Sequence, residues 1–315
     1  MSDIKPLILV TGATGAQGGA VARELLLADF QVRFLTRNPQ SPAAQALIAA
    51  GADAVAGDLE DASSLAAAVK GAAGVFSVQV PDASGTDAER RHGYALVQAA
   101  KAADVTHFVH TSVCEAGNHT QFPRWDSNYW WQKYWTDKWD VEEAVRGAGF
   151  THWTVLKPAF MMENFAQPKA RHMFPHLKQG RIITALLPST RMQLIAADDV
   201  GVVARAAFAA PDKFSHQNID LAIEALNMDD VALTLARVLD KPVSSESVSP
   251  VKAIEAGVFA GWVRSQEWTN EVGYRADIPA VTKSLALRDI VLTSFASWVA
   301  RHASEIEIDA RGTES

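Results

Sequence analysis

The sequence contains one cysteine, Cys114, among 315 residues. A single cysteine cannot form an intramolecular disulfide, which is typical of proteins from a reducing compartment, so we predict a cytoplasmic location. No run of apolar residues reaches the roughly 18 that a membrane-spanning helix needs. The apolar stretch near the N-terminus, Leu7–Val10, is too short for a signal peptide and predicts a buried strand instead. We therefore expect no membrane association.

An excess of basic residues is also missing. The chain has 29 Lys and Arg against 36 Asp and Glu, a formal net charge of -7. That balance argues against nucleic acid as the main partner, because binding a phosphate backbone needs clustered positive charge. A metal site is not expected either. His172 and His176 have the spacing of one helix face, but Pro175 interrupts the helix and no third ligand is evident.

The first half of the sequence alternates short apolar runs with amphipathic stretches. Such alternation is typical of a parallel sheet whose strands are joined by helices. The expected strands are residues 7–10, 32–35, 53–56, 75–78, 107–111 and 153–156, and the clearest helices are 43–50, 63–69, 89–103 and 130–146. The pattern predicts an α/β fold, a doubly wound parallel sheet of the Rossmann type, in a dinucleotide-binding domain over residues 1–157.

The pattern changes after Lys157 and Pro158, where short helices and strands are mixed. We predict a smaller, mixed α/β substrate domain over residues 158–304 that partly returns to the first sheet. Its clearest elements are strands at 193–195 and 218–221 and helices at 198–208, 228–239 and 251–257. Residues 305–315 are mainly polar and are expected to form a frayed tail.

A glycine-rich segment lies between the first strand and the first helix. Gly12, Gly15 and Gly18 have a spacing that permits a tight turn and a close approach of backbone to a ligand. The N-terminus of the following helix offers free N–H groups to a pyrophosphate. The alternative is a tight turn without a ligand, but the position in the first strand–helix unit favours dinucleotide binding. The residues assigned to this cofactor contact are Thr11, Gly12, Thr14, Gly15, Ala16, Gln17 and Gly18.

The end of the second strand indicates which dinucleotide is bound. Arg37 stands where an acidic residue would bind the ribose hydroxyls of NAD, and an arginine there suits the 2′-phosphate of NADP. The sequence therefore favours NADP(H), with an exposed loop arginine as the alternative. Arg33, four residues earlier on the strand, is a weaker candidate to assist Arg37. Asp58 and Leu59 follow the third strand and are expected to border the adenine. Asp58 can also cap the next helix, and the two roles are not exclusive.

Several motifs together resemble the NmrA-like family of atypical short-chain dehydrogenases/reductases. They are Val10–Val21, Lys157–Phe165 and Ala197–Gly201. The resemblance implies a Rossmann domain that binds NADP(H) and a substrate cleft under a small C-terminal domain. The family contains both reductases and redox-sensing regulators without enzymatic activity. With this arrangement in mind, the remaining assignments are Val78 and Pro158 to the cofactor, and Phe160 and Asn164 to the substrate.

Tyr134 and Lys138 form a Tyr-x-x-x-Lys pair, which on a helix places both side chains on one face. The resemblance to the wider superfamily implies that Lys138 lowers the pKa of Tyr134 and holds the nicotinamide ribose, while Tyr134 transfers a proton. Ser112, at the end of the fifth strand, is expected to polarise the same substrate oxygen. The departure from the NmrA-like pattern is Tyr134 itself, and packing within an aromatic segment is the alternative role for it.

Five of the nine tryptophans lie in the segment from Trp125 to Trp139. If a helix begins near Trp130, then Trp130, Tyr134 and Lys138 form one row and face the cofactor, so Trp130 is a candidate wall of the substrate cleft. A neighbouring row of tryptophans is expected to pack on the sheet. Trp125 and Tyr129 would form a lid in the preceding loop. The alternative is that these rings form a homodimer contact.

The sequence thus favours an NADPH-dependent reductase of a small aromatic or conjugated carbonyl, quinone or imine. In this hypothesis Tyr134, Lys138 and Ser112 are the catalytic group, and the partner is a small molecule. The alternative from a different class is a non-catalytic regulator that senses NADP(H) and acts through a protein partner. An isomerase or epimerase that recycles its cofactor also stays open. The sequence does not distinguish the enzyme from the sensor, and it does not give the oligomeric state.

Overall fold

A computed structural model describes residues 5–82 and 84–309. The chain divides into two compact units, each built from separate stretches of sequence. Unit 1 contains the described residues up to Thr120, Trp131–Pro158 and Ala197–Asp220, and unit 2 contains Gln121–Trp130, Ala159–Ala196 and the described residues from Leu221 onward. The sequence had predicted a change near residue 158. The assignment of Gln121–Trp130 to the second unit had not been expected.

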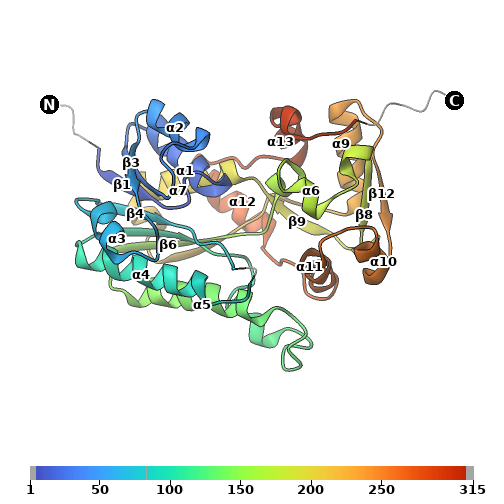
Figure 1. The fold of residues 1–315 in the computed structure, drawn as a ribbon, viewed down its shortest axis with the longest axis horizontal. Helices are drawn as coiled ribbons and strands as arrows, with labels where there is room; N and C mark the ends of the chain where they lie inside the picture. Colours follow the sequence, from blue (N-terminus) through green and yellow to red (C-terminus); the bar gives the residue numbers. More distant parts are fainter. Residues whose placement is uncertain (1–4, 83, 310–315) are drawn as a thin grey trace. The chain divides into compact units, whose positions relative to one another are not determined.

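Unit 1 is built on a seven-stranded sheet in the order β10-β6-β5-β4-β1-β2-β3 (Figure 1). The pairs from β6 through to β3 are all parallel. The strands are β1 (Leu7–Val10), β2 (Gln31–Thr36), β3 (Asp53–Ala56), β4 (Gly74–Ser77), β5 (His107–Thr111), β6 (His152–Pro158) and β10 (Gln217–Leu221). The predicted doubly wound α/β fold is confirmed. Its strand order reverses between β1 and β4, where such sheets open a ligand crevice at the carboxyl ends of the strands.

Helices connect these strands and bury their apolar sides against the sheet. They are α1 (Ala16–Leu27), α2 (Pro42–Ala49), α3 (Ala62–Val69), α4 (Ala88–Ala102), α5 (Gln132–Gly147), α7 (Ala197–Ala209) and α8 (Pro211–Phe214), with a 3₁₀ turn at His119–Gln121. Leu9 and Phe108 of the sheet share one core with Leu65 of α3 and Leu96 of α4. The strands are apolar on both faces, as expected where helices cover a parallel sheet.

The segment Ala197–Asp220 belongs to unit 1. Helix α7 packs along α1, and β10 extends the sheet beside β6. Arg205 of α7 pairs with Glu24 of α1 at 3.0 Å, on the solvent side of this contact. The two acidic residues expected to begin α7, Asp198 and Asp199, lie in its first turn, where negative charge complements the helix dipole.

Unit 2 combines short strands with small helices around its own core. Strand β9 (Met192–Ile195) pairs with β7 (Phe160–Met161) and β11 (Glu224–Leu226), and β8 (Arg181–Thr184) pairs with β12 (Ser244–Ser247). The helices are α6 (Ala170–Met173), α9 (Met228–Leu239), α10 (Pro250–Glu255), α11 (Ala260–Glu271), α12 (Ile278–Ala286) and α13 (Phe295–Arg301), with 3₁₀ turns at Met162–Phe165, Leu177–Gln179 and Ala303–Glu305. In this core Phe165 stacks on Phe174 and packs at a tilt against Phe295.

Two sequence-based predictions about elements were wrong. The long helix begins at Gln132 instead of Trp130, so Trp130 lies outside it. The predicted frayed tail is packed as far as it is described, because Ile306 and Ile308 are only 3% and 2% exposed in the core of unit 2. Residues 310–315 of that tail lie outside the described residues. Among the helices that the structure describes, none is both long and apolar enough to span a membrane.

Candidate functional site

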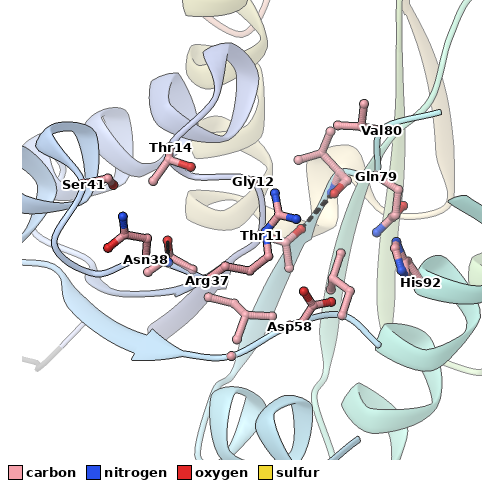
Figure 2. A pocket seen from close by; sticks show the side chains of 15 residues that line it. Thr11, Gly12, Thr14, Arg37, Asn38, Ser41, Asp58, Gln79, Val80 and His92 are labelled. Atoms are coloured by element: carbon pink, nitrogen blue, oxygen red, sulfur yellow. Dashed lines mark hydrogen bonds between the residues drawn. The ribbon is translucent and has the colours of Figure 1, made fainter. Parts of the chain in front are cut away.

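A cavity of about 450 Å³ lies in unit 1 where the strands β1 to β4 end (Figure 2). Loops that follow each of these strands contribute to its wall, together with one residue of α4. The lining residues are Thr11, Gly12, Thr14, Leu35, Thr36, Arg37, Asn38, Ser41, Gly57, Asp58, Leu59, Val78, Gln79, Val80 and His92. The cavity therefore lies at the carboxyl edge of the sheet, where the strand order reverses.

The loop after β1 is held tightly against β4 and α1. Gly12 has φ +61, and a Cβ there would lie 2.5 Å from Val78 Cγ1. A Cβ on Gly18 would lie 2.4 Å from the Gly12 carbonyl oxygen, so α1 begins directly against the loop. Thr11 holds this loop against the end of β4, because its Oγ1 accepts a hydrogen bond from the Val78 N–H at 3.0 Å. Only glycine fits these two positions, and the backbone of this loop is left open to solvent.

One end of the cavity carries the positive charge of Arg37. Arg37 and Asn38 are exposed at the end of β2, and Ser41 caps α2 by accepting from Ala44 N–H. Figure 2 shows Arg37 between Asn38 and Asp58. Arg33, considered as a helper, has another role: its guanidinium donates to the carbonyl oxygens of residues 68 and 70 at 3.1 and 2.6 Å, at the end of α3. Arg37 is therefore the arginine available to a ligand in this cavity.

Asp58 and Leu59 line the cavity beyond Arg37. Asp58 does not cap α3, so that predicted role was wrong: the capping side chain is Asp61, which accepts from Ser63 N–H at 2.9 Å. The backbone of Asp58 is instead held by Ser64, whose hydroxyl accepts from its N–H at 3.0 Å and donates to its C=O at 2.8 Å. The Asp58 side chain accepts from the Glu60 N–H, which keeps it in the turn.

The other end of the cavity is formed by the residues after β4 and by His92 of α4. Gln79 is 5% exposed, and its amide nitrogen donates to Ser77 Oγ at 2.9 Å. Val80 is exposed at the rim. His92 is tied to Glu60, with Nε2 and Oε1 2.8 Å apart. Hydrogen bonds from Arg91 and His92 hold the pKa of the Glu60 carboxyl below its ordinary value.

Seven residues assigned to the cofactor from sequence are part of the wall: Thr11, Gly12, Thr14, Arg37, Asp58, Leu59 and Val78. Gly15, Ala16, Gln17 and Gly18 lie in the adjoining turn and first turn of α1. Gln17 accepts from Thr111 Oγ1 at 2.7 Å, and the Pro158 carbonyl accepts from the Cys114 N–H. Eight wall residues had not been assigned to the cofactor from sequence: Leu35, Thr36, Asn38, Ser41, Gly57, Gln79, Val80 and His92. Only Ser41, just before Pro42, had a recognisable local pattern, that of a helix start.

The expected pairing of Tyr134 and Lys138 differs in the structure. Lys138 is buried, and its Nζ donates to Glu89 Oε1 of α4 at 2.7 Å. Its ammonium lies 5.1 Å from the Tyr134 ring centre. The pKa of Tyr134 is raised by burial and by the neighbouring Glu89, so the expectation of a lowered pKa was wrong. Glu89 lies on the same buried face of α4 as Leu96 and Ala100. An acidic residue on an otherwise apolar helix face indicates a buried ionic partner, and this pattern was visible in the sequence.

Ser112 follows β5 and is buried in a polar cluster within unit 1. Its backbone N–H donates to the Leu156 carbonyl at 2.8 Å. The neighbouring carboxyl is Glu142 of α5, whose pKa is raised because burial outweighs the attraction of Lys157. Lys157 Nζ donates to the Ala116 carbonyl at 2.6 Å and lies 3.7 Å from Glu142. The backbone of Ser112 is thus tied to β6 directly after β5 ends.

The residues assigned to substrate all belong to unit 2. Trp130 is buried, its Nε1 donates to the Pro123 carbonyl at 2.6 Å, and it does not share a helix row with Tyr134. Phe160 is buried and stacks on Trp262, with ring centres 4.9 Å apart. Asn164 is half-buried in the 3₁₀ turn after β7. The aromatic row also differs from the prediction, since Trp131 is 43% exposed instead of packed on the sheet.

Trp125 and Tyr129, predicted to form a lid, lie in the segment Gln121–Trp130, which contacts α11 inside unit 2. Tyr129 lies between two guanidinium groups, those of Arg124 and Arg264, at 3.6 and 3.9 Å from its ring centre. Its hydroxyl donates to Glu267 at 2.7 Å, and Arg124 pairs with Glu271. Cation–π contacts of this kind stabilise by about 0.5–2 kcal/mol each. Tyr129 is therefore an anchor of this segment.

The cavity has the features that a nucleotide requires. The backbone turn at Gly12 and Gly18 leaves room for a phosphate close to the chain, Arg37 supplies charge, and Gln79 offers a buried polar atom at the other end. Thr11, Gly12, Thr14 and Arg37 would hold its phosphates. Within the described ranges, no three His, Cys, Asp or Glu side chains lie close enough together to hold a metal ion.

Comparison with known proteins agrees with this architecture. The sequence profile of the NmrA-like family matches residues 4–293. An NAD(P)H azoreductase of Xenophilus azovorans is 30% identical over 82% of this chain and 83% of its own. The NADPH complex of the Escherichia coli quinone oxidoreductase QOR2 superposes with a TM-score of 0.73 at 21% identity, over 93% of this chain and 99% of that one. The negative transcriptional regulator NmrA in complex with NADP gives 0.73 at 20% identity, over 99% of both chains.

Proposed function

Because the chain belongs to the NmrA-like family, we propose that it is an NADPH-dependent reductase that binds its cofactor in the cavity of unit 1. The observation that carries the proposal is the wall of that cavity. That wall contains two features: a glycine turn whose backbone no side chain covers, and an exposed arginine at the end of β2. A pyrophosphate fits the first feature and a 2′-phosphate fits the second.

Cofactor choice is tested first, at Arg37. A charge-assisted contact to a phosphate contributes about 1.5–3 kcal/mol, so Arg37→Ala should weaken NADPH binding by one to two decades and leave NADH binding nearly unchanged. The matched control is Arg33→Ala, which removes the bonds to the end of α3 but no cavity residue. Titration of both variants with both cofactors measures the effect. Equal affinity of the unmodified protein for NADPH and NADH would contradict the assignment to NADP.

The proposed substrate is a small aromatic or conjugated molecule with a reducible double bond, such as a quinone, an imine or a carbonyl. The names of the azoreductase and the quinone oxidoreductase support this class. The bound nicotinamide would supply a hydride. Tyr134 is proposed as the source of the accompanying proton, because a tyrosine hydroxyl carries its proton at neutral pH and can donate it. Lys138 and Ser112 are proposed to orient this group and the reduced atom.

Turnover is tested by following NADPH oxidation with a panel of quinones, azo dyes and aromatic aldehydes. Tyr134→Phe should lower kcat at least about a hundredfold while NADPH still binds, since general acid catalysis contributes about 10² to 10⁴. The control is Tyr94→Phe, an exposed tyrosine on α4. Full activity of Tyr134→Phe on a good substrate would remove the tyrosine from the mechanism while leaving the reductase assignment in place.

A non-catalytic NADP(H) sensor is the second candidate function. The observation that favours it is the pairing of Lys138 with Glu89, because a lysine held by a buried carboxylate is not free to lower the tyrosine pKa. The structural similarity to NmrA in complex with NADP is consistent with this alternative. Tight NADPH binding without oxidation across the whole panel would support the sensor, whereas turnover with any member supports the reductase.

A further inference from the structure

An ion pair beside Tyr134 is buried between helices α4 and α5 of unit 1. Lys138 Nζ donates to Glu89 Oε1 at 2.7 Å, and the two residues are only 7% and 4% exposed. The same ammonium lies 5.1 Å from the Tyr134 ring centre. Glu89 therefore holds a cation that faces the tyrosine proposed as the proton donor.

The packing of α4 on α5 brings the two charges together. A Cβ on Gly93 would lie 2.4 Å from Val141 Cγ2, so the helices approach closely at that point. Glu89 lies one turn before Gly93 on α4, and Lys138 lies one turn before Val141 on α5. The close approach one turn away thus places the carboxylate within hydrogen-bond distance of the ammonium.

A second acid, Asp137, also faces Glu89, but it pairs with a different lysine. Asp137 Oδ1 lies 3.3 Å from Lys133 Nζ, one turn earlier on α5. Burial raises the pKa of Glu89, Lys138 opposes this effect, and Asp137 adds to it. Glu89 is thus the acid that balances the charge of Lys138.

Two further titratable groups near Tyr134 and Lys138 carry no charge. Burial and the nearby Lys138 lower the pKa of His110 on β5 to about 3, so its ring is neutral at pH 7. Cys114 lies near Tyr134, and its thiol donates to the Lys157 carbonyl at 2.8 Å. A donating thiol keeps its proton, so neither group offsets the lysine charge.

A buried ion pair contributes little to stability, because the loss of hydration offsets much of the attraction between its charges. Beside a tyrosine such a pair has a second effect. An ammonium 5.1 Å from the ring centre without a counter-charge would favour the tyrosinate, and a bound carboxylate cancels that effect. The pKa of Tyr134 agrees with this balance, because burial raises it and the charge of Glu89 raises it further.

We propose that Glu89 is a positioning residue of the reductase, which holds the Lys138 ammonium in place, balances its charge and thereby keeps Tyr134 in the protonated form that reduction requires. Reduction needs the tyrosine hydroxyl as a proton donor, whereas the reverse oxidation of the product needs the tyrosinate as a proton acceptor. The pair thus favours the reductive direction. The inference rests on the proposed function, because it assumes that Tyr134 exchanges a proton with the substrate.

The test uses Glu89→Gln in the full chain. Glutamine keeps the shape and an acceptor for Lys138 but removes the negative charge. The pKa of Tyr134 should then fall by about two pH units, because the lysine charge at this distance is no longer balanced. The measurement is the ultraviolet absorbance of tyrosinate during an alkaline titration. Since the chain has four tyrosines, the signal of Tyr134 is isolated by subtracting the titration of a double variant that also carries Tyr134→Phe.

Glu142→Gln is the matched control for loss of a buried acid. Glu142 is fully buried one turn after Lys138 on the same helix, and it pairs with Arg146. Its replacement removes a carboxylate but leaves the partner of Lys138 in place, so the titration of Tyr134 should not move. If the pair of Glu89 and Lys138 were only a structural link, both variants would lose stability without any shift in that titration.

Turnover gives a second readout, with opposite expectations for the two directions of the reaction. In Glu89→Gln the pH at which reduction declines should fall by the same amount as the tyrosine titration. Oxidation of the reduced product with NADP as the acceptor should begin to rise at a correspondingly lower pH. General damage to the fold would lower both rates at every pH, so it cannot produce this pattern.

Removal of the second charge completes the test. Lys138→Met in the Glu89→Gln background leaves no charge in the pair and should return the titration of Tyr134 toward that of the unmodified protein. An unchanged titration of Tyr134 in Glu89→Gln would overturn the inference and leave the proposed function intact. Absence of turnover by the unmodified protein with every substrate of the panel would overturn the proposed function, and with it the role in proton donation.

Discussion

Two histidines of β5 show how burial sets the behaviour of single side chains. His107 is 6% exposed and packs between the Phe208 and His152 rings, with centres 4.8 and 5.6 Å away. Burial, helped by the neighbouring His152, lowers the pKa of His107 to about 4. His110 lies on the same strand with an even lower pKa. Both rings are neutral in the folded protein at pH values where an exposed histidine begins to take up a proton.

Acid should therefore destabilise the protein through these rings. A histidine whose pKa is lowered by folding stabilises fully above its unfolded value, about 6.5, and that stabilisation is lost as the pH falls toward the folded value. For His107 the loss between pH 7 and pH 5 is about 2 kcal/mol. His107→Phe should remove this part of the pH dependence in urea unfolding, whereas His172→Phe, at an exposed position, should not. The same pH dependence in all three proteins would contradict the prediction.

Among the secondary-structure elements, the N-terminus of α1 is the one on which the proposed phosphate contacts depend most directly. This helix begins directly against the loop after β1, and a Cβ on Gly18 would lie 2.4 Å from the Gly12 carbonyl oxygen and 2.6 Å from that of Thr11. Backbone cannot yield as a flexible side chain does, so the helix would have to move away from the loop. The phosphate contacts proposed for this turn depend on that close approach.

Gly18→Ala is thus expected to abolish NADPH binding and to lower the free energy of unfolding by a few kcal/mol, as overpacking does. The matched control is Gly147→Ala near the end of α5, where a Cβ meets nothing within 4 Å. That variant should bind NADPH normally and be stabilised by up to about 1 kcal/mol, because alanine loses less backbone entropy on folding. Calorimetry and denaturant unfolding measure both effects. Normal NADPH affinity in Gly18→Ala would rule out a close-approach role for Gly18.

At the scale of the whole molecule, each unit is assembled from segments distant in sequence. In unit 2 the last described residues are hydrogen-bonded to earlier segments. The Gln167 N–H donates to the Glu305 carbonyl at 2.9 Å, and the Asp309 N–H donates to the Lys178 carbonyl at 2.7 Å. Ile306 and Ile308 fill its core. The end of the described chain therefore holds together elements that precede it by more than a hundred positions.

Ile308→Ala should consequently lower the stability of the protein by about 2–5 kcal/mol, the cost of emptying a buried aliphatic site. Ile254→Ala, at a 47% exposed position of α10, is the matched control and should cost far less. Thermal and denaturant unfolding of the two variants give the comparison. NADPH binding to the cavity of unit 1 is expected to survive in both. Similar losses for Ile308→Ala and Ile254→Ala would contradict the packed role of this segment.

Local patterns in the sequence determined the fold class and one side of the candidate site. Alternating apolar runs and helix starts are short-range signals, so β3 and β5 were predicted with the bounds that the structure has. The glycine turn and Arg37 follow directly from their positions next to β1 and β2. The family assignment was also carried by contiguous motifs, among them Lys157–Phe165.

Tertiary structure alone decided the features that join distant positions. The pairing of Lys138 with Glu89 depends on how α5 packs on α4, and it reversed the expected effect on the pKa of Tyr134. Ser77 of β4 contacts both the Gln79 amide and the His110 ring of the neighbouring strand. Periodicity cannot predict such contacts, because it reports which face of an element is buried and not which polar side chain meets it there. The sequence therefore determined the sheet and its phosphate turn, and only packing decided which buried polar groups meet around them.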